Sequence, residues 1–386
     1  MPQRIGDILT EKRILVCAGS GGVGKTTTAA ALALAAARAG KKTLVLTIDP
    51  AKRLAASLGL PELDHQERRV PDDRLREGGG QVVAGGELYA MMLDQKRAFD
   101  EVVERYARDP AARQKIFNNR IYQQIASSLS GSHEYAAMAK LFEIDRASKY
   151  EMVVVDTPPT AHALDFLDAP EKVSSAIESP AVDWFVKPLQ AGGRFSIKLI
   201  GRGGSFVLKR IAKFVGSDFL EDMAKFFVEF NDVLGGFRER AREVFDLLRG
   251  PKVGFVLVTA PEPEAVDEAL LFHARLMSSK MPFSAFVINR VRKAGPPPPD
   301  RSHLVDKLAH RPELAGVPPY DIGRAAEALL ETDAEWRILA GGDAREIARL
   351  HAAVDGNSTI VEVPYLDHDV HHVAGLTELG RYLLAS

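Results

Sequence analysis

The chain has 386 residues, a formal net charge of −2 and a single cysteine, Cys17. The near-neutral charge gives no electrostatic preference for nucleic acid, so we expect no nucleic-acid partner. One cysteine excludes an internal disulfide and any paired-cysteine metal site within the chain. The sequence shows neither a basic-then-apolar leader nor an apolar run of the roughly 18 residues that span a bilayer. We therefore expect a cytoplasmic protein with at most transient membrane association.

The first motif in the chain is a phosphate loop. Residues 19–27 are Gly-Ser-Gly-Gly-Val-Gly-Lys-Thr-Thr and fit the pattern G-x-x-x-x-G-K-[ST] at every fixed position. The run 13–18, which is apolar after Arg13, predicts a strand before the loop. The Ala- and Leu-rich run 26–38 predicts a helix after it, capped by Gly40. Such a loop points backbone N–H groups at phosphate oxygens, and the helix N-terminus adds partial positive charge. We expect nucleotide phosphates to bind at Gly21, Gly22, Val23, Gly24, Lys25, Thr26 and Thr27.

The rest of the chain alternates between strand and helix patterns. Strands are expected at 42–48, 87–93, 151–155, 252–258, 283–288 and 359–363, and helices at 52–58, 95–107 (with Asp94 as N-cap), 111–147, 264–279, 302–354 and from about 376. The polar, glycine-rich stretch 61–86 is expected to be a mobile loop. This alternation predicts an α/β fold with a doubly wound, mainly parallel sheet.

A helical subdomain is expected to be inserted into a single phosphate-loop domain that spans 1–386. It comprises approximately 95–147 and 170–250, and a second helical insertion covers approximately 293–358. Ten of the 18 phenylalanines lie between Lys172 and Gly250. Several of them recur at helical spacing and form a broad apolar face. That periodicity fits a small helical core as well as an open apolar groove.

Two aspartates follow apolar strand patterns further along the chain. Asp49 ends the Thr-Leu-Val-Leu-Thr-Ile run, and Asp156 ends the Met-Val-Val-Val run. The carboxyl ends of parallel strands lie side by side, so both should meet the phosphate loop. Asp156 matches the Walker-B pattern, and we expect Mg²⁺ at Thr26, Asp49 and Asp156, partly through water. The catalytic candidates are Lys25, at the β- and γ-phosphates, and Asp49, which would position water for hydrolysis. Asp49 could instead be a turn residue before Pro50, and Asp156 a helix cap.

These motifs resemble those of the deviant-Walker ATPases. Within that group they are similar to the family that holds the arsenite-pump ATPases and the guided-entry ATPases, which deliver tail-anchored membrane proteins. The segments that carry the likeness are the loop at 19–27, Thr47-Ile-Asp-Pro-Ala, Asp156-Thr-Pro-Pro-Thr-Ala-His, Asn289-Arg290 and Val363-Pro364.

The resemblance implies an ATP-hydrolysing dimeric switch that uses ATP and Mg²⁺ and binds hydrophobic transmembrane-helix clients. Asp49 would lie in switch I, and 156–162 would form switch II, which senses the γ-phosphate. Asn289 would recognise the adenine base and Pro364 would line its pocket. The segment from Lys172 to Gly250, together with part of 111–147, would form the client groove.

Three departures from the family pattern bear on function. Ser20 stands where the family carries a lysine that reaches the partner's nucleotide, so hydrolysis is expected to be weak or to depend on other charges. The lone cysteine allows no zinc clip between subunits, so we expect no zinc, and it disfavours an arsenite or anion pump. The dimer could be a homodimer or a heterodimer with a paralogue. The main alternative is a regulatory or weakly active ATP-binding partner subunit.

Overall fold

The computed structural model describes residues 3–48, 53–120, 122–123, 132–157, 233, 239–240, 242–354, 356 and 358–385. A sheet of eight strands organises this part of the chain. The strand order is β3-β4-β2-β5-β1-β6-β7-β8. The strands are β1 (Ile14–Ala18), β2 (Lys42–Thr47), β3 (Arg68–Arg69), β4 (Glu87–Met92), β5 (Met152–Asp156), β6 (Val253–Thr259), β7 (Phe283–Val291) and β8 (Thr359–Pro364). Every pairing is parallel except that of the short edge strand β3 with β4.

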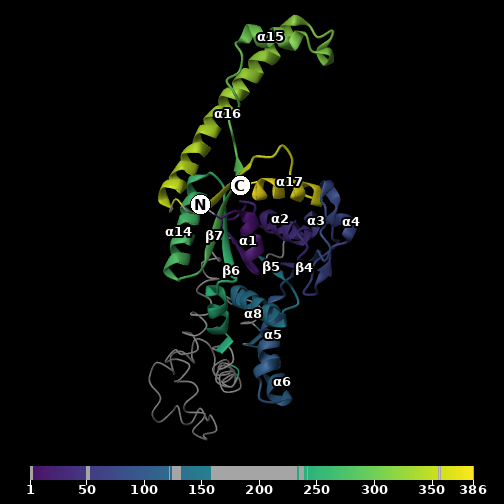
Figure 1. Ribbon diagram of the computed structural model, residues 1–386, viewed down its shortest axis with the longest axis vertical. Coiled ribbons are helices and arrows are strands. Elements are labelled where there is room, and N and C mark those ends of the chain that lie inside the picture. Colours follow the sequence, from purple (N-terminus) through teal and green to yellow (C-terminus); the bar gives the residue numbers. More distant parts are fainter. Residues whose placement is uncertain are drawn as a thin grey trace, which may run out of the picture.

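Helices cover both faces of this sheet (Figure 1). They are α1 (Ile5–Glu11), α2 (Lys25–Arg38), α3 (Arg53–Ser57), α4 (Asp72–Leu75), α5 (Gln95–Tyr106), α6 (Pro110–Asn118), α8 (Ser132–Ala147), α14 (Pro263–Ser278), α15 (Arg301–Ala309), α16 (Pro319–Ala353) and α17 (Val373–Leu384). The predicted α/β fold with a mainly parallel, doubly wound sheet is confirmed.

The two faces of the sheet pack into separate hydrophobic cores because strand side chains alternate in direction. In β1, Ile14 and Val16 belong to the core that includes residues of α5, α8 and α14. Leu15 and Cys17 belong to the core built with α1, α2 and α17. All five residues of β1 are buried, as expected for a central parallel strand covered on both faces.

The expected elements match the structure closely, with two corrections. The helix expected at 302–354 is divided into α15 and α16, with a 3₁₀ turn (Pro312–Leu314) between them, because prolines at 312, 318 and 319 cannot continue a helix. Residues 61–86 were expected to be a mobile loop without regular structure. They instead hold β3, α4 and a 3₁₀ turn (Glu77–Gly79). Leu63, Val70 and Leu75 in this stretch are buried in the core beside α2, so tertiary packing overrides the polar local composition. The short helix α1 was not predicted.

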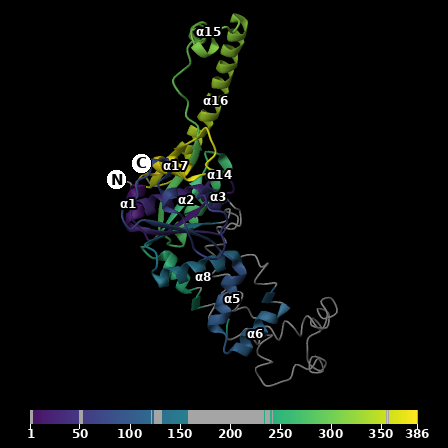
Figure 2. The same ribbon diagram turned by 90° about the vertical axis from the view of Figure 1, so that its right-hand side faces the viewer.

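Two helical regions lie at opposite ends of the long axis of the molecule (Figures 1 and 2). Helices α5, α6 and α8 lie at one end, and α15 with the outer half of α16 projects at the other. Helix α16 has 35 residues, which corresponds to about 50 Å. No helix among the described residues is long and apolar enough to cross a bilayer.

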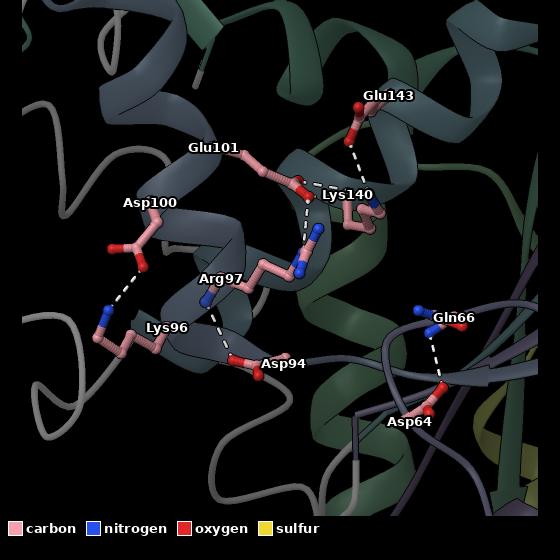
Figure 3. A network of polar contacts seen from close by, with 9 residues as sticks. All are labelled: Asp64, Gln66, Asp94, Lys96, Arg97, Asp100, Glu101, Lys140 and Glu143. Atoms are coloured by element: carbon pink, nitrogen blue, oxygen red, sulfur yellow. Dashed lines mark hydrogen bonds and ion pairs between the residues drawn. The ribbon is translucent and has the colours of Figure 1, made fainter. Parts of the chain in front are cut away.

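Charged side chains connect α5 to α8 on the surface (Figure 3). Lys140 of α8 pairs with Glu101 of α5 at 3.3 Å and with Glu143 at 3.0 Å. The predicted N-cap Asp94 is confirmed, because its carboxylate accepts a hydrogen bond from the Arg97 amide. Ion pairs that remain partly accessible to solvent stabilise a fold weakly, so the buried residues of these helices, including Phe99 and Leu141, supply most of their packing energy.

The predicted division into domains remains a prediction. Most of the phenylalanine-rich segment 170–250 lies outside the described residues, which within it are 233, 239–240 and 242–250.

A buried ion pair fixes the base of α16 to the sheet. The carboxylate of Asp343, 2% exposed, accepts hydrogen bonds from the Arg292 backbone amide at 2.7 Å and from its guanidinium at 2.9 and 3.1 Å. Trp336 of the same helix donates to the Lys293 carbonyl and packs edge-on against Tyr365. These contacts join α16 to the ends of β7 and β8.

We predict that Asp343→Ala lowers the free energy of unfolding by about 3 kcal/mol, because it leaves the Arg292 guanidinium half-buried without its counter-ion. Urea denaturation of the whole chain measures the effect. The matched control is Asp306→Ala, since Asp306 lies on α15 with its side chain 71% exposed, and its loss should change stability by less than about 0.5 kcal/mol. Equal effects of the two substitutions would contradict the structural role of this pair.

Candidate nucleotide-binding site

The phosphate loop connects β1 to the N-terminus of α2, as predicted. Gly21 and Gly22 are exposed at its tip, whereas Val23 is buried beneath it. Gly24 ends the loop with a φ of +98°, a conformation that side chains other than glycine rarely adopt. A Cβ at Gly24 would also lie 2.3 Å from the amide nitrogen of Asn289. A bulkier residue would therefore break the loop geometry that an anion requires.

Lys25 opens α2 and folds back over its own loop. Its side chain is buried, and its Nζ donates a hydrogen bond to the Ser20 carbonyl oxygen at 2.7 Å. A buried ammonium beside the N-terminus of a 14-residue helix places positive charge at the phosphate loop. The arrangement suits the phosphates of a nucleotide.

Asp156 brings two strand ends and the phosphate loop together. It is fully buried at the end of β5 and accepts hydrogen bonds from the Thr26 hydroxyl at 2.8 Å and the Thr47 hydroxyl at 3.0 Å. In the register of the sheet it lies opposite both Cys17 and Thr47. Thr47 was not singled out from the sequence, although a threonine closing an apolar strand two residues before Asp49 is the signal that could have revealed it.

The oxygen atoms gathered here fit a magnesium ion bound with ATP. Mg²⁺ prefers hydroxyl, carboxylate and phosphate oxygens and retains several waters. Thr26 and Asp156 present a hydroxyl and a carboxylate in contact beside the phosphate loop. A group of three or more His, Cys, Asp or Glu side chains able to hold a metal does not occur among the described residues, which do not include Asp49.

Asp49 lies outside the described residues, as do 50–52 and 158–162. Its role as the water-positioning group and that of 156–162 as switch II therefore remain predictions. The structure does place Thr47, two residues before Asp49, in contact with Asp156, so the end of β2 reaches the site.

Asn289 and Pro364 lie on the opposite side of the phosphate loop from Asp156. Asn289, near the end of β7, donates from its side-chain amide to the Val23 carbonyl at 2.9 Å. Pro364 ends β8 opposite Val291. The site therefore runs along the carboxyl edge of the sheet, from β2 and β5 through β1 to β7 and β8, with Asn289 and Pro364 at the end predicted to hold the base.

The single cysteine is embedded beneath this site. Burial raises the pKa of the Cys17 thiol well above its ordinary value, and the Asp156 carboxylate raises it further, while Lys25 partly opposes the shift. A protonated, buried thiol is neither a nucleophile nor a metal ligand. Cys17 is therefore a packing residue, as expected from its position in a strand.

Comparison with known protein families agrees with these motifs. The model of the anion-transporting ATPase family, ArsA_ATPase, matches residues 12–296, well over half of the chain. The chain belongs to this family. The match takes in the phosphate loop, Asp156 and Asn289, and it ends before α15 and α16.

Curated relatives of this family member include two fungal proteins named ATPase GET3. The one from Malassezia globosa is 28% identical over 178 residues, which is 46% of this chain and 48% of the relative. The one from Aspergillus terreus is 28% identical over 179 residues, which is 46% of this chain and 49% of the relative. The matched region thus spans about half the length of these relatives. The resemblance stated from the motifs is confirmed at the level of the family.

We predict that Thr26→Ala weakens Mg-ATP binding by about tenfold or more, because it removes a hydroxyl that contacts Asp156 at the proposed Mg²⁺ position. Isothermal titration with ATP, with Mg²⁺ and with EDTA, measures the effect, and the Mg²⁺ dependence should disappear in the variant. Thr28→Ala is the control on the same helix, since the buried Thr28 hydroxyl has no hydrogen-bond partner among the residues that the structure describes. Undiminished Mg²⁺ dependence in Thr26→Ala would show that Thr26 does not serve the metal.

Proposed function

We propose that this protein is an ATP-hydrolysing dimeric switch that binds hydrophobic segments of membrane proteins. The observation that carries the proposal is the contact of Asp156 with Thr26 and Thr47, which assembles a phosphate loop, a Walker-B carboxylate and the strand preceding Asp49. Membership in a family of ATPases, and relatives named ATPase GET3, support the hydrolytic reaction.

The roles of the residues follow from their chemistry. Lys25 and the loop amides neutralise the phosphate charge, Thr26 and Asp156 hold Mg²⁺ with its water shell, and Asp49 positions the attacking water. Mg²⁺, when bound, supplies charge neutralisation at the phosphates. Asn289 and Pro364 bind the base. Nucleotide closes two subunits around the sites, and hydrolysis opens them and releases the client.

The proposed client is an apolar transmembrane helix, as the resemblance to guided-entry ATPases implies. The phenylalanine-rich stretch between Lys172 and Gly250 supplies the apolar residues for such a groove. Arsenite as cargo is disfavoured because soft thiolate ligands are needed, and the one cysteine of the chain is buried in β1.

A second candidate function follows from Ser20, which replaces the family's lysine in the loop. A chain without that cation could bind ATP and regulate a paralogous subunit that supplies its own lysine. The side chain of Ser20 is a neutral hydroxyl and adds no positive charge. Its backbone carbonyl accepts a hydrogen bond from Lys25.

We predict that a photo-crosslinker at Phe226 or Phe230 captures an apolar tail-anchor peptide, and more of it with ATP than with ADP, because nucleotide closure assembles the groove. Gel analysis of the crosslinked product measures capture. A scrambled polar peptide and a crosslinker at Tyr320, exposed on α16, are the controls. Capture no greater than in these controls would contradict the proposed client groove.

A further inference from the structure

A bulge interrupts the pairing of β7 with β8 next to the phosphate loop. Ile288 pairs with Glu362 and Val291 pairs with Pro364, so two residues of β7, Asn289 and Arg290, oppose a single residue of β8. An extra residue of this kind redirects side chains and is common beside active sites. Here it directs Asn289 onto the Val23 carbonyl of the loop and leaves Arg290 exposed.

Arg290 has a backbone conformation that is costly for its residue type. Its φ is +61°, and among the described non-glycine residues only Ser148 and Lys280 also have a positive φ. Those two follow the ends of α8 and α14, where a left-handed residue is an ordinary helix termination. Arg290 instead lies inside a strand. Strain at such a position persists where the surrounding structure imposes it and often marks a functional site.

The charge of Arg290 has no partner within the described part of the chain. Its neighbours Arg292 and Lys293 are paired with Asp343 and Glu362. No hydrogen bond or ion pair involves Arg290 among the described residues, and its side chain is exposed. The end of β7 therefore carries a cation, Arg290, that is unpaired within the described residues and adjoins Asn289, which contacts the phosphate loop.

The position of Arg290 along the sheet edge determines which part of a bound nucleotide lies near its side chain. The phosphate loop follows β1, and Asp156 and Thr47 close the site from β5 and β2. Strand β7 lies two strands away from β1 in the other direction, which is about 10 Å. An extended nucleotide with its phosphates over β1 and its Mg²⁺ toward β5 thus has its nucleoside at β7.

We propose that the guanidinium of Arg290 lies against the purine ring of bound ATP and contributes to its affinity. This deepens the proposed function and rests on it. A planar, weakly hydrated guanidinium stacks on aromatic faces better than an ammonium does. Asn289 recognises the edge of the base while Arg290 covers its face, and the bulge places the two side by side.

The test compares Arg290→Gly with Lys280→Gly by isothermal titration and thermal unfolding of the full chain. Glycine accepts a positive φ without strain, so both variants should raise Tm. Only Arg290→Gly should weaken ATP binding, by about tenfold. Its affinity for inorganic tripolyphosphate should stay within about twofold of wild type, because that probe lacks a base.

Two results would overturn the inference: unchanged ATP affinity in Arg290→Gly, or equal losses for ATP and tripolyphosphate, which would place Arg290 on the phosphates. Failure of the wild-type chain to bind ATP would overturn the proposed function, and this inference with it. Arg290→Lys keeps the charge and should recover only part of the affinity, because an ammonium stacks less well than a guanidinium. Full recovery would be a third result that overturns the stacking.

Discussion

The contact between Asp156 and the hydroxyls of Thr26 and Thr47 is the interaction on which the rest of the site depends. It exists because β5 lies between β2 and β1 and all three run in the same direction. A shift of one residue in either pairing would turn Asp156 to the other face of the sheet. The apolar residues before it, buried in both cores, fix that register. Core packing thus determines where the Asp156 carboxylate, which we propose binds Mg²⁺, meets the phosphate loop.

Charge is distributed unevenly along the same edge. Lys25 supplies the cation at the phosphate end, where it is held on the Ser20 carbonyl, and Arg290 supplies one at the β7 end. The ends of β7 and β8 are further tied to α16 through Arg292, Asp343, Trp336 and Tyr365. Helix α16, which lies beyond the residues matched by the family model, thereby packs against the strands that are predicted to hold the base. Because Ser20 occupies the position of the loop lysine that the resemblance implies, we infer that the γ-phosphate is neutralised without that lysine.

Motifs with fixed spacing were predictable from the sequence, and contacts created by folding were not. The phosphate loop, the strand ending at Asp156 and the N-cap Asp94 each carry a local signal, and the structure has them where expected. The pairing of Arg292 with Asp343 joins residues 51 positions apart, and the bulge at Asn289 depends on the register of β8. The stretch 61–86 lacked a local signal because its few apolar residues are buried only through tertiary packing, in the core that includes α2 and α17. Asp49 and most of 170–250 keep their roles as predictions.

The most direct test of the central claim is phosphate release from Mg-ATP by the purified chain alone, with Asp49→Asn as its control. We predict steady release by the wild-type chain. In Asp49→Asn the rate should fall by roughly two or more orders of magnitude, the range for catalytic acid–base groups, because the water loses its positioning group. ATP binding without release above that of Asp49→Asn would contradict the central claim. That result would favour the partner-subunit function, in which a paralogue supplies the cation missing at Ser20.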